Sequence, residues 1–119
     1  MLKQLNTQTG RLGEKLASEY LKRKGYKILE QNYRTRYAEI DLVARQKDVL
    51  VFVEVRTKIG EQFGTPEETL NRWKLERVKR NAFAYAAKIR WKKLYRVDAV
   101  CIVLNDDQKV ERLKHYENI

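Results

Sequence analysis

The spacing of hydrophobic positions divides the chain into helical and strand-like segments. Residues 10–24 place leucine, alanine and tyrosine on one side of a helix, with Thr9 in front as a cap and Gly25 behind as a left-handed stop. Residues 71–89 repeat this amphipathic pattern. The pattern therefore predicts two helices, each with one face to bury.

Five other segments have the short, β-branched character of strands. The third of them, residues 49–56, is almost continuously hydrophobic, which is typical of a central strand covered on both faces. The last is rich in charge and is expected at a sheet edge. The order α-β-β-β-α-β-β predicts an α/β fold with helices flanking a mixed sheet. The expected strands are 26–33, 38–44, 49–56, 95–104 and 110–116.

The length of 119 residues predicts one domain over 1–119, in which 1–8 form a flexible leader. No hydrophobic run approaches about 18 residues, so neither a signal peptide nor a membrane span is expected. The single cysteine, Cys101, cannot form an intrachain disulfide and is interpreted as a small core residue. This cysteine usage fits a reducing compartment, and we expect a cytoplasmic protein.

The positive charge is concentrated in one stretch of the chain. Lys and Arg number 26 against 16 acids, a net charge of +10, and between positions 72 and 96 ten basic residues are opposed only by Glu76. Such a local field suits a polyanion, although a solvated basic surface is the alternative. We expect a nucleic-acid partner, with DNA favoured over RNA, and no membrane. The contacts are predicted from Arg72, Lys74, Arg77, Arg80 and Lys88, with the last three on the outward face of the second helix.

Glu54 is the most unusual residue because it lies inside the hydrophobic run 49–56. A carboxylate in such a strand is unfavourable unless it is protonated, paired or bound to a cation. If a hairpin pairs Ala44 with Val49, Asp41 becomes a diagonal neighbour of Glu54 on the same face. A slip of one residue would separate them.

The same register places two more charged residues beside this pair. Glu39 lies opposite Glu54, and Arg56 shares the face because residues two apart on a strand do. Converging carboxylates repel one another, and a hard divalent ion relieves that repulsion. The alternative interpretation is a structural ion pair between the carboxylates and Arg56.

Several motifs together resemble the YraN-type family of uncharacterised bacterial proteins. That family is similar in turn to the restriction-endonuclease-like PD-(D/E)xK nucleases and, within them, to archaeal Holliday-junction resolvases. The resemblance extends over nearly the whole chain. It is carried by Gly13–Ala17, Ala38–Ala44, Val51–Arg56, Phe63–Glu67, Arg96–Val100 and His115–Asn118.

The resemblance implies roles for individual residues. Glu14 matches the helix carboxylate, Asp41 the strand aspartate and Glu54 the first residue of (D/E)xK. These three would bind Mg²⁺ or Mn²⁺, and Glu14 would act as a ligand or orient water. The motif lysine falls on Arg56, which keeps the charge and can hold phosphate but cannot act as a base near neutral pH. Lys58, two residues further on, is a candidate substitute and nucleic-acid contact, and Glu39 is a candidate rim residue.

Two functions follow from these features. The first is a divalent-metal-dependent endonuclease that hydrolyses phosphodiester bonds in DNA, including branched or damaged DNA. The alternative is a catalytically degenerate, nuclease-like module that binds nucleic acid without cleaving it, which the departure at Arg56 favours. A purely structural interaction protein leaves Glu54 and the basic stretch unexplained. Either of the first two could be a homodimer, since related folds pair to engage two strands.

The remaining candidates have simpler interpretations. His115 has no second histidine with which to build a zinc site. Asp98 is expected to form a structural pair with Arg96. Three aromatic residues are interleaved with basic ones and can either stack on bases or pack at the edge of the core. They are Trp73, Trp91 and Tyr95.

Overall fold

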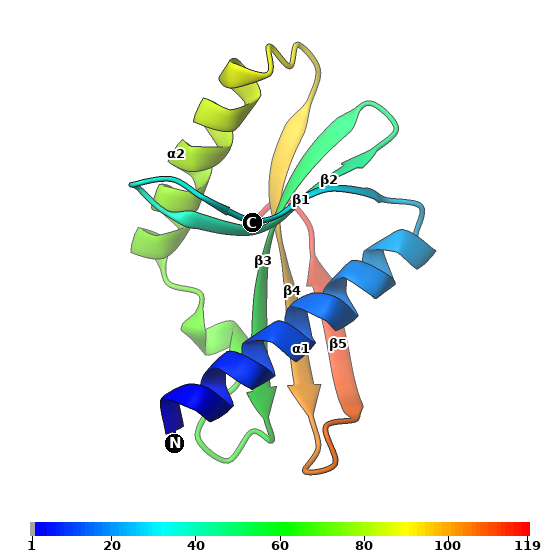
Figure 1. Cartoon of the computed structure of the whole chain (residues 1–119), viewed down its shortest axis with the longest axis vertical. Coiled ribbons are helices and arrows are strands. Elements are labelled where there is room, and N and C mark those ends of the chain that lie inside the picture. The colour runs from blue at the N-terminus through cyan, green and yellow to red at the C-terminus, as the bar shows by residue number, and fades with distance from the viewer. Residues whose placement is uncertain (1) are drawn as a thin grey trace.

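A five-stranded sheet forms the middle of the molecule, and one helix packs on each face (Figure 1). The computed structural model describes the backbone of residues 2–119 and the side chains from Thr7 onward. The predicted element order and the expected α/β fold are confirmed. In chain order the elements are α1 (Leu2–Arg23), β1 (Lys27–Arg34), β2 (Glu39–Gln46), β3 (Val49–Ile59), the 3₁₀ helix η1 (Pro66–Thr69), α2 (Arg72–Lys88), β4 (Tyr95–Leu104) and β5 (Val110–Tyr116).

The strands lie in sequence order, from β1 at one edge to β5 at the other. β1, β2 and β3 form an antiparallel meander. The chain then crosses over through η1 and α2, so that β4 pairs with β3 in parallel, and β5 returns antiparallel. β3 is the central strand and β5 an edge strand, as predicted.

The helix α1 covers one face of the sheet. Ala17 and Leu21 are fully buried against Leu42 and Val53. Nearer its start, the helix approaches β3 so closely that a Cβ on Gly13 would lie 1.8 Å from Thr57 Oγ1. Only glycine permits that separation between helix and strand.

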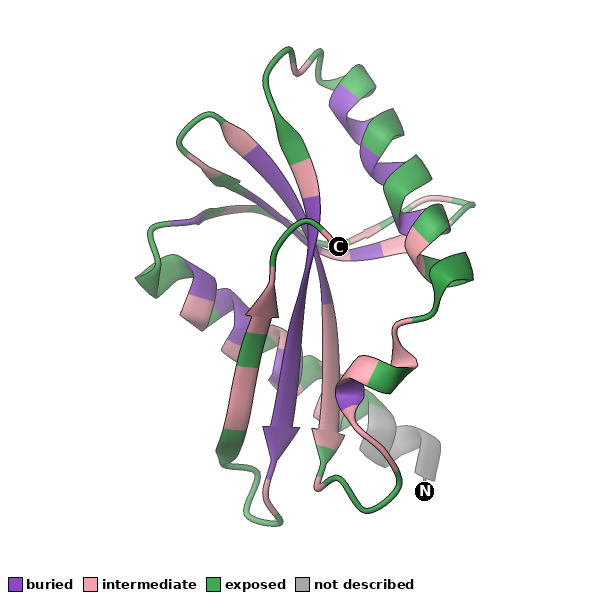
Figure 2. Cartoon of the chain, turned by 180° about the vertical axis from the view of Figure 1, so that it is seen from behind, coloured by how far each residue is buried: buried purple, intermediate pink, exposed green. Residues whose placement is uncertain are grey.

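The helix α2 covers the opposite face. Val78, Ala82 and Tyr85 pack against Phe52 and other apolar residues of the central strands. The buried colour follows the inner strands and one side of each helix in Figure 2. Among residues 2–119, no helix is both long enough and apolar enough to cross a membrane.

The predicted start of the first helix is wrong. It begins at Leu2 rather than Gly10, so residues 2–8 are helical and Thr9 is not a cap. The reason lies in the spacing of Leu5, Thr9 and Leu12, which continues the helical repeat through Gly10. Met1 lies outside the described residues. The predicted left-handed stop is confirmed, because Gly25 has a φ of 91°.

The predicted register of the central hairpin is also wrong, by two residues. Ala44 pairs with Val51 rather than Val49, because Gln46 pairs with Val49 across a two-residue turn. Lys47 adopts a φ of 54° in that turn, which lets it be so short. Since side chains alternate with a period of two, this shift preserves which residues share a face.

The other boundaries agree closely with expectation. α2 is capped by Asn71, whose side chain accepts a hydrogen bond from the Lys74 backbone N–H. β4 and β5 have the predicted limits. β3 is longer than predicted, because its parallel pairing with β4 continues to Ile59, opposite Leu104.

Candidate functional site

A cavity of about 420 Å³ opens on the face of the sheet that carries α2. Its lining comes from α1, β2, β3, α2 and the connection between β1 and β2, so residues distant in sequence meet there. Six charged side chains predicted as site residues line it, together with the candidate rim residue. They are Glu14, Asp41, Glu54, Arg56, Lys74 and Arg77, with Glu39 at the rim.

Asp41 and Glu54 form the most buried acidic pair of this cavity. The ladder between β2 and β3 stops at Leu42 and Val53, so these two residues are the next along each strand. Their carboxyl groups are hydrogen-bonded to each other, and Asp41 Oδ2 also accepts a 2.7 Å bond from the Val55 backbone N–H. They are therefore direct neighbours, closer than the diagonal arrangement that the sequence predicted.

Burial decides the protonation of this pair. Burial and the negative charge of Glu54 raise the pKa of Asp41 to about 8. Burial also raises the pKa of Glu54, although the Arg56 guanidinium beside it acts in the opposite direction. Below about pH 8 the Asp41 carboxyl therefore keeps its proton, which lessens the repulsion between the two groups.

Arg56 extends from β3 on the same face. Its Nη2 donates a 2.8 Å hydrogen bond to Glu54 Oε2, which is the ion pair of the alternative interpretation. Its Nε atom is buried and has no hydrogen-bond partner among the described residues. The guanidinium is therefore only partly satisfied by hydrogen bonds within the described residues.

Glu14 reaches the cavity from α1, where it is half-buried. Burial raises its pKa, and the charges of Asp41 and Glu39 add to this effect. Asn32 opposes them: its Nδ2 donates to Glu14 Oε1 at 2.9 Å and to Glu39 Oε1 at 3.0 Å. Glu39 is also paired with Arg34 at 3.0 Å, so it is tied into the wall of the cavity.

Sequence reasoning did not find Asn32. Its backbone is left-handed, with a φ of 52°, a conformation that asparagine tolerates better than most residues. The only feature of the sequence that could have drawn attention to this residue is that asparagine is uncommon within a strand.

The first turns of α2 form the basic wall. Lys74 lines the cavity and its charge lowers the pKa of Glu54, against the larger effect of burial. Arg77 was predicted to lie on the outward face, and this prediction is wrong. It is half-buried, hydrogen-bonded to the Tyr37 carbonyl and stacked on Trp73. The outward position holds for Arg72, Arg80 and Lys88, which are exposed.

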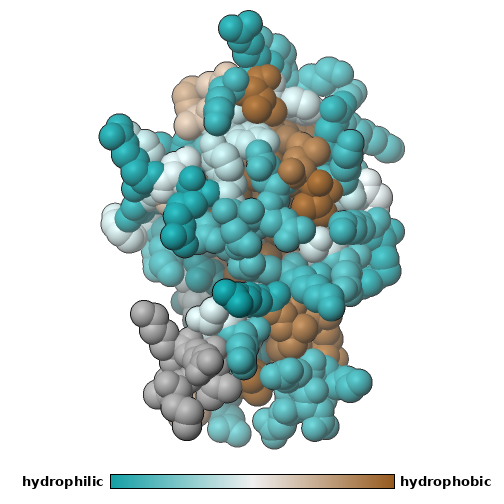
Figure 3. All heavy atoms as spheres, viewed as in Figure 1, coloured by the Kyte–Doolittle hydropathy of each residue, from teal (hydrophilic) through white to brown (hydrophobic). Residues whose placement is uncertain are grey.

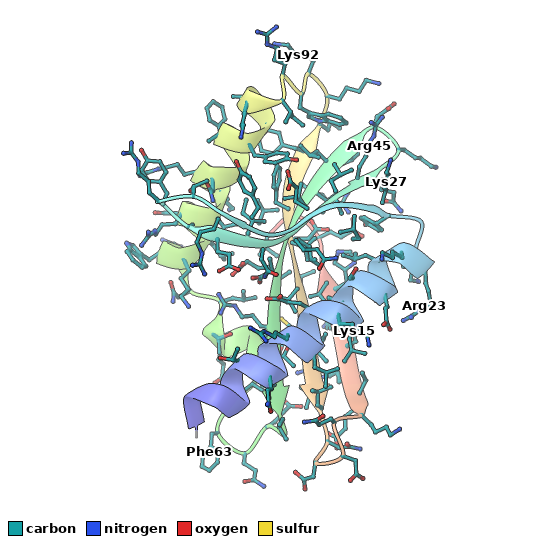
Figure 4. The ribbon with its side chains drawn as sticks, viewed as in Figure 1. Lys15, Arg23, Lys27, Arg45, Phe63 and Lys92 are labelled. Carbon is teal, nitrogen blue, oxygen red and sulfur yellow. The ribbon has the colours of Figure 1, made fainter. Side chains whose placement is uncertain are left out.

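Positive charge also extends beyond α2. Figure 4 shows Arg23 at the end of α1, Lys27 and Arg45 on the β1–β2 side, and Lys92 beyond α2. The face in Figure 3 is mostly hydrophilic, with smaller apolar patches between the polar side chains.

Lys58 and two of the aromatic candidates, Trp91 and Tyr95, do not line the cavity. Lys58 shares the face of Glu54 and Arg56, but its Nζ donates to the Phe63 carbonyl at 3.4 Å and it does not line the cavity. Trp91 packs against the hydrophobic cluster under α2 and carries Arg45 on its ring. Of the three aromatic candidates, Trp73 alone reaches the cavity.

A second polar cluster surrounds Asp98, which is fully buried on the α1 face. It accepts hydrogen bonds from Arg96 at 2.9 and 3.1 Å and from the Asn118 backbone at 2.9 Å, and it contacts His115 Nε2 at 2.7 Å. Burial alone would raise the pKa of Asp98, but the His115 and Arg96 bonds outweigh it and lower that pKa. Each polar group is satisfied, in agreement with the predicted structural pair.

The donors of the cavity suit a divalent ion only in part. Over the described residues, no three Asp, Glu, His or Cys side chains converge closely enough to hold a metal by themselves. Mg²⁺, however, commonly takes one or two carboxylates and completes its shell with water and phosphate oxygens. Asp41 and Glu54 fit that requirement once Asp41 loses its proton, whereas Glu14 lies outside the pair.

Fold and site together define a small mixed α/β domain in which a buried carboxylate pair faces a basic helix. The chain belongs to the uncharacterised protein family UPF0102, whose model matches residues 13–102. This membership confirms the resemblance to the YraN-type family.

Relatives of similar length carry the same family name. A UPF0102 protein of Pelotomaculum thermopropionicum is 39% identical over 110 residues, which cover 92% of both chains. One from Thermodesulfovibrio yellowstonii is 39% identical over 111 residues, covering 93% of this chain and 94% of its own. One from Syntrophomonas wolfei is 48% identical over 81 residues, covering 68% and 70%.

Proposed function

We propose that the chain is a divalent-metal-dependent endonuclease that hydrolyses phosphodiester bonds in DNA. One observation carries the proposal: the buried Asp41–Glu54 pair opens into a cavity whose facing wall is basic. Buried acids that need a proton to coexist are suited to a cation, and the basic wall is suited to a phosphate. A site for both lies within one cavity.

The two carboxylates have the role of metal ligands in this proposal. Asp41 is held in position by the Val55 N–H, and Glu54 by the Arg56 guanidinium. To hold a cation both carboxylates would have to be ionised, so Asp41 would have to lose its proton. When bound, Mg²⁺ or Mn²⁺ supplies acidification of a water molecule and neutralises charge on the phosphate.

The remaining side chains of the cavity orient the reactants. Arg56 lines the cavity with a permanent positive charge, so it can hold a phosphate oxygen and stabilise developing charge. Lys74 brings an ammonium group to the same cavity from α2. Glu14, half-buried and fixed by Asn32, is placed to orient a water.

The outer surface of α2 would position the nucleic-acid backbone. Arg72, Arg80 and Lys88 are exposed, and none of them has a carboxylate partner among the ion pairs of the described residues. Unpaired basic side chains release condensed counterions from phosphates without reading the base sequence. The proposed enzyme therefore recognises nucleic-acid shape more than sequence.

One observation favours a second function, a binding module without cleavage. Arg56 occupies the position at which a PD-(D/E)xK nuclease has lysine. Its guanidinium forms an ion pair with Glu54, the carboxylate that is proposed to bind the metal. Arginine cannot exchange a proton near neutral pH. In this alternative the ion pair replaces the metal, and the cavity holds a phosphate only.

Cleavage assays separate the two functions. We would incubate the protein with Mg²⁺ or Mn²⁺ and single-stranded, duplex, flapped and four-way DNAs, alongside RNA counterparts. Glu54→Gln and Asp41→Asn should lose cleavage, while the exposed Glu19→Gln on α1 should retain it. Tight, salt-sensitive binding with cleavage no greater than that of Glu54→Gln would establish the binding module instead.

A further inference from the structure

Two exposed aromatic rings stand at the cavity. Trp73, in the first turn of α2, is 64% exposed, and Tyr37, between β1 and β2, is 45% exposed. Both line the cavity that holds the carboxylate pair. Large aromatic side chains exposed beside a site are a recurring sign of a ligand surface. Such a ring stays in contact with water until a ligand covers it, and burying it then contributes to binding.

Arg77 links the Trp73 ring to the backbone of Tyr37. Its guanidinium lies 4.7 Å from the centroid of the Trp73 ring, and it donates a hydrogen bond to the Tyr37 carbonyl. A second arginine, Arg36, lies 5.1 Å from the Tyr37 ring centroid. Each ring thus has a guanidinium beside it, so a flat π-system and a positive charge occur together at each position.

This combination matches the chemistry of single-stranded nucleic-acid recognition. Proteins that hold unpaired strands combine aromatic platforms, on which bases stack, with positive charges along the backbone. A base inside a duplex is already stacked on its neighbours and cannot use such a platform unless it is flipped out. The rings are therefore useful only toward an unpaired nucleotide.

We propose that Trp73 and Tyr37 form a base-stacking subsite that selects nucleic acid with an unpaired nucleotide next to the phosphate held by the carboxylate cavity. This inference rests on the proposed function, since it names the substrate class of the same site. It favours single-stranded and flapped DNA over continuous duplex, and over a fully paired four-way junction.

The test compares affinities for matched single-stranded, flapped, duplex and four-way DNAs in Ca²⁺, read by fluorescence anisotropy. Wild type should prefer the first two. Trp73→Ala and Tyr37→Ala should each weaken binding to flapped DNA by about tenfold, within the range for loss of one stacked base, and leave duplex binding unchanged. Phe83→Ala is the control, because Phe83 is an exposed aromatic on α2 that does not line the cavity.

A second readout follows the base itself. A 2-aminopurine at the unpaired position should be quenched by wild type and by Phe83→Ala, and not by Trp73→Ala. Equal losses of affinity for flapped and duplex DNA, or quenching that survives Trp73→Ala, would overturn the subsite.

Parallel cleavage in Mg²⁺ distinguishes the two proposals. Cleavage that requires Asp41, in a protein whose preference for flaps is unaffected by Trp73→Ala, would remove the subsite and retain the nuclease. A Trp73-dependent preference without any cleavage would retain the subsite and remove the nuclease. Absence of nucleic-acid binding would remove both.

Discussion

Asp41 Oδ2 accepts a 2.7 Å hydrogen bond from the backbone N–H of Val55, the residue between Glu54 and Arg56. The bond forms where the β2–β3 ladder has ended, so a side chain takes over the role of a backbone carbonyl. It fixes the aspartate against the strand that carries the other carboxylate. The geometry of the Asp41–Glu54 pair therefore depends on where the backbone pairing of β2 and β3 ends, as well as on the two acidic side chains.

Stability should depend on pH through Asp41. Its pKa rises from 3.8 to about 8 on folding, so the folded state holds a proton that the unfolded state releases. The stabilisation is complete below about pH 4 and is lost as the pH rises toward 8. Urea midpoints measured from pH 5 to 9 should fall for wild type and much less for Asp41→Asn; parallel slopes would contradict the assignment.

Metal binding should show the opposite dependence. A cation must displace the Asp41 proton, so Mn²⁺ affinity should increase with pH up to about 8. Calorimetric titration at pH 6 and pH 8 measures this. Asp41→Asn and Glu54→Gln should bind weakly at both values, and Glu19→Gln should behave as wild type. An affinity independent of pH would place the ion elsewhere.

Removing Arg56 should destabilise the fold. Glu54 is only 6% exposed, and without its partner the carboxylate is left uncompensated. We expect Arg56→Ala to lower the free energy of unfolding by about 3 kcal/mol, the lower end for a broken buried pair, because Arg56 retains some solvent contact. The double variant with Glu54→Gln should recover most of the loss. Equal stability of Arg56→Ala and wild type would show that the pair contributes little.

Two glycines of α1 should respond to alanine in opposite ways. At Gly13 the new Cβ would meet Thr57 Oγ1 at 1.8 Å, and such overpacking should cost about 1–3 kcal/mol. At Gly10 nothing lies within 4 Å, so alanine should stabilise the helix by about 0.5–1 kcal/mol. Thermal unfolding of both variants checks this, and a common direction of change would contradict the close contact between α1 and β3.

Charge reversal on α2 should weaken nucleic-acid binding and its dependence on salt. Arg80 and Lys88 are exposed, and neither takes part in an ion pair among the described residues. Each lost phosphate contact should reduce the slope of log affinity against log salt by about 0.9 on duplex DNA. Lys109→Glu, in the exposed β4–β5 turn, is the control. Unchanged slopes would show that α2 is not the contact surface.

The sequence predicted the sheet well because its strands are short, apolar and separated by clear turns. It could not predict the hairpin register, since a left-handed Lys47 gives no composition signal. The face shared by Asp41 and Glu54 was still correct, because an error of two residues preserves the alternation of side chains. Had the shift been one residue, the candidate site would have been lost.

The rest of the cavity depends on tertiary placement. Glu14 was assigned through the family resemblance, which matches it to the carboxylate of the first helix. Tyr37 was not found because it lies in the β1–β2 connection, whose path the sequence pattern leaves undetermined. Asn32 was not found because it lies within β1 in a left-handed conformation that the strand pattern does not predict. Arg77 was assigned to the wrong face for a related reason: its long side chain turns toward the Tyr37 carbonyl instead of following the helical projection.

The cavity takes its lining from the first helix of the chain and from α2, on either side of three strands. A chain still being synthesised has β2 and β3 before it has α2, and therefore has the acids without the basic wall. A fragment that lacks α1 has no Glu14. The cavity is therefore complete only after α2 has been made and has packed on the sheet, and loss of either helix would remove part of its lining.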